Sequence, residues 1–168
     1  MSTLLANTRV IRVMFVCLGN ICRSPTAHGV FEGLVKQRDL QNIIQVESSG
    51  TGDWHIGHPP DLRAAQEAKR RGYDLSRLRA QQVTVEDFYN FDYILAMDCS
   101  NLADLEAMRP ADCNVHLGLF LSFASGEATL EVPDPYYGGD EGFTRVLDMI
   151  EEASEGLLQE ICSARSLQ

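Results

Sequence analysis

Hydrophobic and polar positions follow two different periods along the chain, and this predicts an alternation of strands and helices. Residues 10–16 form a short apolar run rich in β-branched residues, which is typical of a strand buried on both faces. Ser24 and Pro25 follow and predict a helix that Ser24 caps and Pro25 opens. Apolar residues then recur at the spacing of one helix face, at Ala27, Val30, Phe31, Leu34 and Val35.

The rest of the chain repeats this alternation. Strands that alternate with helices predict an α/β fold, in which a parallel sheet carries helices on both faces. The crossovers between parallel strands are expected to be right-handed. The strand candidates are residues 43–47, 93–97 and 115–117, and the helix candidates are residues 61–71, capped by Asp61 and ended by Gly72, residues 100–108 and residues 143–161.

The composition fits one ordinary globular domain over residues 1–168, with 45% hydrophobic and 23% charged residues. The net charge is −10, and residues 127–160 hold most of it, with ten acids and one base. A chain of this kind lacks the basic patch that nucleic acid or an anionic membrane surface requires, so we expect neither partner. It also lacks a long apolar stretch and the features of a signal peptide, which favours a cytoplasmic protein.

The segment from Cys17 to Ser24 follows the first predicted strand, which is where ligands bind in open parallel sheets. Backbone N–H groups that turn into a helix N-terminus form a nest for an anion, and Gly19 lets the backbone approach closely. Arg23 can hold two phosphoryl oxygens at once. Cys17 in this positive field is expected to ionise and attack phosphorus, with the Ser24 hydroxyl donating to the thiolate. Cys-x5-Arg-Ser therefore predicts a nucleophile beside a phosphate site; the alternative is an inert buried cysteine and a surface arginine.

Two motifs in this chain closely resemble those of the low-molecular-weight protein tyrosine phosphatases. They are residues 16–25 (VCLGNICRSP) and residues 134–137 (DPYY). The resemblance covers nearly the whole chain, including residues 49–51 and residues 91–98. It implies a single three-layer α/β domain with a four-stranded parallel sheet in the order 2-1-3-4, flanked by helices, and with the phosphate-binding loop after strand 1.

The resemblance also implies an activity and its catalytic residues. The expected reaction is the hydrolysis of phosphotyrosine in proteins, and of aryl phosphates, through a cysteinyl-phosphate intermediate. Cys17 would be the nucleophile, Arg23 the phosphate clamp and Asp134 the general acid and base.

The surroundings of Asp134 favour the same role for this residue. A tyrosine phenolate, with a pKa of about 10, leaves poorly unless it is protonated in the transition state. Asp134 lies between Pro133 and Pro135, which favour a stiff, extended loop. A carboxylic acid held there would protonate the leaving oxygen and later activate the hydrolytic water. The alternative is an ordinary exposed aspartate in a turn.

The residues around the predicted phosphate site are expected to form a deep slot with apolar sides. Such a slot would favour a flat phenyl phosphate over the shorter phosphoserine. Trp54, Tyr136 and Tyr137 are the expected aromatic walls, and for each of them the alternative is half-buried packing. The loop residues Gly19, Asn20, Cys22 and Ser24 are expected at the phosphate itself. The expected walls of the slot are Leu18, Ile21, Trp54, Tyr136 and Tyr137.

The resemblance assigns supporting roles to three further residues. Asp98 would buttress Arg23, Asn20 would order the loop by hydrogen bonds, and Cys22 would form a disulfide with an oxidised Cys17. The residues alone leave other roles open. Asp98 is equally suited to cap the following helix, Asn20 to form a left-handed turn, and Cys22 to fill space at the junction of loop and helix.

One position departs from the pattern of this family. Family members often carry a histidine before the glycine that ends the second helix, where this chain has Arg71 and Gly72. That histidine helps to position the loop asparagine, so the support of Asn20 is in question. The four histidines of this chain have no metal-binding spacing, and we expect them to be structural or exposed. The five cysteines lack regular spacing and are expected to be reduced, so we expect no metal and no cofactor.

Three other functions fit parts of the pattern. An arsenate reductase of the same fold needs two more redox cysteines on a mobile segment, and the chain has no cysteine between Cys22 and Cys99. A phosphate-binding carrier has no use for an acid such as Asp134. A zinc protein needs paired ligands beyond Cys17 and Cys22. The favoured prediction is a metal-independent phosphatase that acts on tyrosine-phosphorylated proteins, as a monomer or weak dimer.

Overall fold

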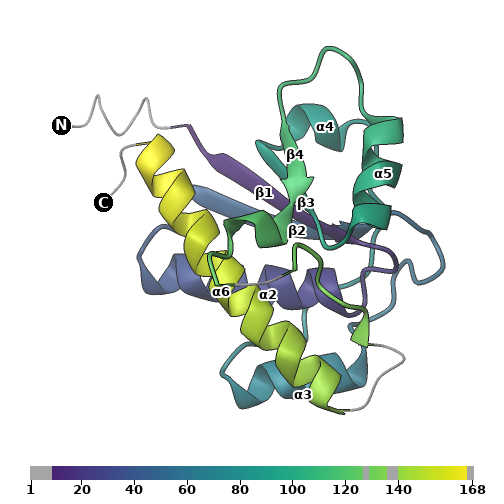
Figure 1. The fold of residues 1–168 in the computed structure, drawn as a ribbon, viewed down its shortest axis with the longest axis vertical. Coiled ribbons are helices and arrows are strands. Elements are labelled where there is room, and N and C mark those ends of the chain that lie inside the picture. Colours follow the sequence, from purple (N-terminus) through teal and green to yellow (C-terminus); the bar gives the residue numbers. More distant parts are fainter. Residues whose placement is uncertain (1–8, 127–128, 136–139, 166–168) are drawn as a thin grey trace.

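A four-stranded parallel sheet forms the centre of the molecule (Figure 1), as the sequence predicts. The computed structural model describes residues 9–126, 129–135 and 140–165. The strands stand in the order β2-β1-β3-β4, and every neighbouring pair is parallel. Their bounds are Ile11–Cys17 for β1, Ile44–Gly50 for β2, Tyr93–Ala96 for β3 and His116–Leu119 for β4.

Helices cover both faces of this sheet (Figure 1). The long helices α2 and α6 pack against each other on one face, and α3 packs against both of them. The helices α4 and α5 belong to the opposite face. The predicted α/β class and the strand order 2-1-3-4 are therefore confirmed. The helices span Arg23–Gln37 for α2, Leu62–Arg70 for α3, Asp87–Asn90 for α4, Cys99–Met108 for α5 and Asp140–Ala164 for α6, with a short 3-10 turn at Phe120–Phe123.

Alternating side chains of β1 supply both layers of the core. Val13 and Phe15 are fully buried against α2 and α6, and the Phe15 ring meets those of Phe31 and Phe120 at centroid distances of 5.7 and 4.8 Å. Met14 and Val16 point to the other face and pack with side chains of α4 and α5. Because β1 is buried on both faces, it holds its carboxyl end at Cys17 rigidly.

The start of α2 differs from the prediction made from the sequence. The helix begins at Arg23, and Cys22 occupies the N-cap position without a side-chain capping bond. Ser24 therefore does not cap the helix: it lies inside the first turn, and its hydroxyl faces Cys17. Pro25 also lies in the first turn, where its missing N–H costs no helical hydrogen bond.

Other helix boundaries agree closely with the sequence. Asp61 caps α3 by accepting hydrogen bonds from the backbone N–H groups of Arg63 and Ala64. Gly72, with a φ of 90°, follows the helix in the left-handed region. The single turn α4 was not predicted from the sequence.

Candidate functional site

The loop between β1 and α2 curls around the sulfur of Cys17. The backbone N–H of Asn20 points at Cys17 Sγ across 3.3 Å, and the Ser24 hydroxyl oxygen lies 3.0 Å from the same sulfur. Asn20 has a φ of 57°, so the backbone takes the left-handed turn that the sequence allowed for this residue. The Cys17 residue is only 3% exposed. Two hydrogen-bond donors are thus available to a thiolate at this position.

The side chain of Asn20 also orders the loop by hydrogen bonds. Its Nδ2 donates to Ser24 Oγ over 2.7 Å, and its Oδ1 accepts from the backbone N–H of Gln81 over 2.9 Å. Asn20 is 3% exposed, so these bonds form away from water. The left-handed turn and the ordering role, which the sequence left as alternatives, occur together in one residue.

Arg71 does not take part in this support. Its guanidinium contacts two carboxylates of α6, Asp148 at 2.8 Å and Glu151 at 2.6 Å. These charges raise the pKa of Arg71 although burial alone would lower it. Arg71 therefore ties the end of α3 to α6, and Gln81 supplies the contact to Asn20 instead.

Arg23 is fixed by contacts on the side away from the cysteine. It is 4% exposed, and its Nη1 donates to Asp98 Oδ2 over 2.6 Å and to the Val132 carbonyl oxygen over 3.1 Å. Burial alone would lower the pKa of Arg23, but the charges of Cys17, Asp98 and Asp134 raise it. The guanidinium therefore stays charged in the site.

Asp98 performs both of the roles that the sequence left open. One oxygen accepts from Arg23, and the other accepts from the backbone N–H of Asn101 over 2.8 Å, which caps α5. Asp98 thus connects the end of β3, the start of α5 and the arginine of the loop.

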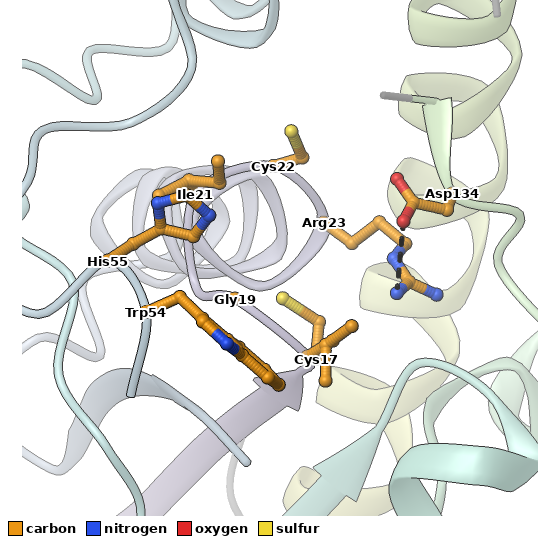
Figure 2. Close-up of a pocket in the computed structure, with 9 residues that line it drawn as sticks. Cys17, Gly19, Ile21, Cys22, Arg23, Trp54, His55 and Asp134 are labelled. Atoms are coloured by element: carbon orange, nitrogen blue, oxygen red, sulfur yellow. Dashed lines mark ion pairs between the residues drawn. The ribbon is translucent and has the colours of Figure 1, made fainter. Parts of the chain in front are cut away.

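A cavity of about 200 Å³ opens above this loop (Figure 2). Asp134 lies beside Arg23, with Oδ2 at 3.9 Å from Nη2, and Trp54 and His55 lie on the opposite side of the cavity. The structure thus gathers residues from three distant parts of the sequence. The lining residues are Cys17, Leu18, Gly19, Ile21, Cys22, Arg23, Trp54, His55 and Asp134.

Tyr136 and Tyr137, predicted as aromatic walls, lie outside the described residues. His55, by contrast, lines the cavity, although it was predicted to be structural or exposed. A Cβ at Gly19 would lie 2.9 Å from the His55 ring, so this ring packs directly on the loop backbone. The only sequence signal was its place beside Trp54.

Trp54 is the most exposed part of this cavity wall, at 66%. Its ring lies over Gly52, where an added Cβ would come within 1.9 Å of the ring. The indole therefore rests on bare backbone beside the cavity and offers an apolar face to anything that enters.

Cys22 lies at the other end of the loop as a free thiol that is 6% exposed. Burial raises the pKa of Cys22, and the negative charges of Asp61, Cys17 and Asp134 raise it further, against the opposing effect of Arg23. The two loop cysteines thus differ in setting, because Cys17 receives the hydrogen bonds of the loop while Cys22 remains protonated.

The described residues contain no group of three His, Cys, Asp or Glu side chains that is arranged to hold a metal ion. Within the same ranges, no helix is long and apolar enough to cross a membrane.

Comparison with known proteins places the chain in a family. The family described as "Low molecular weight phosphotyrosine protein phosphatase" matches residues 12–167. A protein of that description from Schizosaccharomyces pombe is 41% identical over 155 residues, which cover 92% of this chain and 99% of the relative. The crystal structure of a protein tyrosine phosphatase from Entamoeba histolytica superposes with a TM-score of 0.89 at 38% identity, covering 92% of this chain and 99% of the other.

A second similar structure carries a different description. It is the Drosophila arginine phosphatase, with a TM-score of 0.84 and 35% identity, covering 90% of this chain and 98% of that one. The family match and the identities show the class of the protein. The chain belongs to the low molecular weight phosphotyrosine protein phosphatases, which makes it a protein tyrosine phosphatase and a hydrolase.

Proposed function

We propose that this protein hydrolyses phosphotyrosine in proteins through a cysteinyl-phosphate at Cys17, without a metal ion. One observation carries the proposal: the Cys17 sulfur receives the Asn20 N–H and lies against the Ser24 hydroxyl, in a cavity that Arg23 and Asp134 share. Such a cavity offers a nucleophile, an anion clamp and a carboxyl group to one phosphate.

In the first step, the Cys17 thiolate attacks phosphorus and the bond to the aryl oxygen breaks. Asp134 gives its proton to that oxygen, so the phenol leaves neutral. Arg23 and the loop N–H groups hold the equatorial oxygens as charge spreads over them. Phosphate then remains on sulfur, and Asp134 is a carboxylate.

In the second step, a water molecule attacks the phosphorus of the cysteinyl-phosphate. The Asp134 carboxylate takes a proton from this water, and the sulfur leaves as a thiolate. The Ser24 hydroxyl, 3.0 Å from Sγ, stabilises the leaving thiolate by donating to it. Inorganic phosphate is released, and both Asp134 and Cys17 return to their starting states.

The walls of the cavity support an aromatic substrate. Leu18, Ile21 and Trp54 contribute apolar surface around the nucleophile, which suits a phenyl ring more than the short polar arm of phosphoserine. Because a similar structure is described as an arginine phosphatase, phosphoarginine is the competitor that the substrate test must include.

The test is a comparison of phosphotyrosine, phosphoserine and phosphoarginine peptides of one sequence, with phosphate release measured in EDTA. We expect kcat/KM to be highest for phosphotyrosine and unchanged by EDTA. Higher kcat/KM for phosphoarginine would overturn the substrate assignment, and loss of activity in EDTA would overturn metal independence. A phosphate carrier would release no phosphate from any of them.

The nucleophile is tested with Cys17→Ser. A serine hydroxyl is a far weaker nucleophile at this position, while the loop and Arg23 still bind an oxyanion. We expect turnover of p-nitrophenyl phosphate to be abolished and phosphate binding, measured by calorimetry, to persist. Cys113→Ser is the matched control, because Cys113 is a buried free thiol of the opposite sheet face. Near-normal turnover by Cys17→Ser would remove Cys17 from the mechanism.

A further inference from the structure

A buried histidine outside the cavity is connected to the end of β2 by a hydrogen bond. His28 lies on α2, is 4% exposed, and its Nδ1 is 3.0 Å from the hydroxyl oxygen of Ser48. Ser48 is also held through its backbone, because its carbonyl oxygen accepts from Gln81 Nε2 over 2.9 Å. His28 and Gln81 therefore hold the same strand residue from two sides.

Gln81 carries this connection to the nucleophile loop. Its backbone N–H donates to Asn20 Oδ1 over 2.9 Å, and its carbonyl oxygen accepts from the Gly50 N–H over 2.8 Å. Asn20 in turn donates to Ser24 Oγ and points its backbone N–H at Cys17 Sγ. A displacement at Ser48 would thus pass through Gln81 and Asn20 to both donors that face the nucleophile.

The burial of His28 favours its neutral form. Burial lowers the pKa of His28 to about 4, Glu47 opposes this effect, and Arg77 adds to it. His28 Nε2 makes no hydrogen bond and faces Glu32 Oε2 at 3.7 Å, and Glu32 pairs with Arg77. The nearby Glu32 carboxylate favours the proton on Nε2, so Nδ1 accepts the Ser48 hydroxyl proton.

We infer that His28 is a positioning residue for the phosphatase reaction, acting through Ser48, Gln81 and Asn20 on the donors around Cys17. The inference rests on the proposed function. It gives His28 the task that the family resemblance assigns to a histidine at the position of Arg71. Arg71 itself is bound to Asp148 on α6 and does not contact the loop.

The contacts predict an effect on kcat more than on KM. The phosphate clamp Arg23 is held by Asp98 and Val132, and neither of them contacts Gln81 through a hydrogen bond. The anchoring of the phosphate by Arg23 is therefore independent of His28. The two donors at Cys17 act on the sulfur as it attacks and leaves, so their displacement weakens the chemical steps.

The experiment compares His28→Leu, which fills the site without a polar atom, with His28→Asn, whose amide oxygen can accept at the position of Nδ1. Turnover of p-nitrophenyl phosphate by the full chain is measured at pH 7. We expect His28→Leu to lower kcat by about tenfold, less than the roughly 100-fold that a 1 Å misplacement can cost. KM should change by less than about twofold, and His28→Asn should restore most of kcat.

Ser48→Ala supplies a second test that does not depend on packing at His28. It should lower kcat as His28→Leu does, and the double variant should lose little more, because both changes break one connection. Val35→Ala, buried on the same helix, is the control for lost stability, and Arg71→Ala is the control for the family position. Both should leave kcat near the wild-type value.

The outcomes separate this inference from the function on which it rests. A kcat within twofold of wild type for His28→Leu or Ser48→Ala would overturn the positioning role and leave the phosphatase assignment intact. An equal loss in Val35→Ala would overturn it too, because the effect would then follow stability. A wild-type protein without turnover would overturn the proposed function, and the positioning role with it.

Discussion

Two carboxylates next to one arginine have different surroundings, and this difference separates their roles. Asp98 Oδ2 lies 2.6 Å from Arg23 Nη1, and its other oxygen caps α5, so both oxygens are committed to holding structure. Asp134 Oδ2 is 3.9 Å from Arg23 Nη2, and its side chain is 38% exposed. The more exposed carboxylate, which water and a leaving group can reach, is therefore the one suited to carry a proton.

The first prediction concerns Asp134→Asn, which keeps the size of the side chain and removes its acid. We expect kcat for phosphotyrosine to fall by about 10²–10⁴, the usual range for general acid–base catalysis. The loss should be smaller for p-nitrophenyl phosphate, because its leaving group needs little protonation. Glu131→Gln, on the same segment, is the control. Equal losses for both substrates would point to a structural role for Asp134.

The second prediction concerns oxidation of the loop. Peroxide converts the Cys17 thiolate to sulfenic acid, and the Cys22 thiol can displace water from it to form a disulfide. Activity lost in peroxide should then return with dithiothreitol in the wild type and poorly in Cys22→Ser. Because the pKa of Cys22 is raised by burial and by nearby carboxylates, disulfide formation should be slow at neutral pH and faster above it.

Mass spectrometry of the oxidised wild type should find a Cys17–Cys22 crosslink. Cys162→Ser, which changes a half-buried thiol on α6, should recover like the wild type. Equal recovery of Cys22→Ser and wild type would contradict a protective role for Cys22.

At the scale of elements, the site depends on how closely β2 approaches the loop after β1. The backbone of Gly50, the last residue of β2, lies so near the loop that a Cβ there would be 2.6 Å from the Leu18 carbonyl oxygen and 3.2 Å from the Asn20 nitrogen. Both are backbone atoms, which cannot move aside as a flexible side chain can. The absence of a side chain at Gly50 therefore sets the spacing of strand and loop.

The third prediction follows from this spacing. Gly50→Ala should push the loop away from β2, which lowers kcat and destabilises the protein by about 1–3 kcal/mol, the usual cost of overpacking. Urea unfolding and turnover of p-nitrophenyl phosphate measure the two effects. Gly118→Ala is the matched control, because a Cβ on that β4 residue would meet only the His116 ring at 3.6 Å. If Gly50→Ala behaves like Gly118→Ala, the close approach of β2 to the loop does not affect kcat or stability.

The elements of the fold were largely predictable, because local signals and tertiary packing agree in them. β1 is apolar on both sides and buried on both sides, and Asp61 caps α3 as its sequence indicates. The prediction that Ser24 caps α2 was wrong because a serine followed by a proline is also typical of a helix N-cap. In the fold, the Ser24 hydroxyl hydrogen-bonds to the nearby Cys17 sulfur instead. The turn α4 has only four residues, too few for a periodic signal.

The site was predictable where one segment carries it and unpredictable where segments meet. Cys17 and Arg23 belong to one continuous motif, so the sequence alone placed them together. Gln81 holds Asn20 through its backbone N–H, which every residue except proline possesses. The sequence therefore gives no signal of this contact. The double engagement of Asp98 likewise depends on strand order, which brings the end of β3 beside β1.

At the scale of the whole molecule, the response of stability to pH depends on groups that must stay neutral as well as on ion pairs. Acidic residues outnumber basic ones by 24 to 14, so protonation of carboxylates reduces the negative net charge as the pH falls. Protonation of His28, in contrast, would lower stability, because it would place a charge in the core. Its effect falls in a pH window that most of the carboxylates do not share.

The fourth prediction is a loss of stability between pH 6.5 and about 4 that depends on His28. Burial lowers the pKa of His28 from 6.5 to about 4 in the folded protein, while the unfolded chain keeps the ordinary value. Within that window the unfolded state binds a proton that the folded state does not. The contribution of His28 to stability is therefore complete above pH 6.5 and falls as the pH drops toward 4. At about 1.4 kcal/mol per pH unit, the total is about 3.5 kcal/mol. Urea unfolding of wild type and His28→Asn at intervals from pH 7.5 to 4.5 isolates this term, because the contributions of the carboxylates cancel in the difference. The advantage of the wild type over the variant should shrink steadily below pH 6.5.

His58→Asn, a change at an exposed histidine, should give a nearly constant difference. A difference for His28→Asn that is just as constant would mean that His28 is protonated at little cost and that its surroundings are wetter than its burial implies.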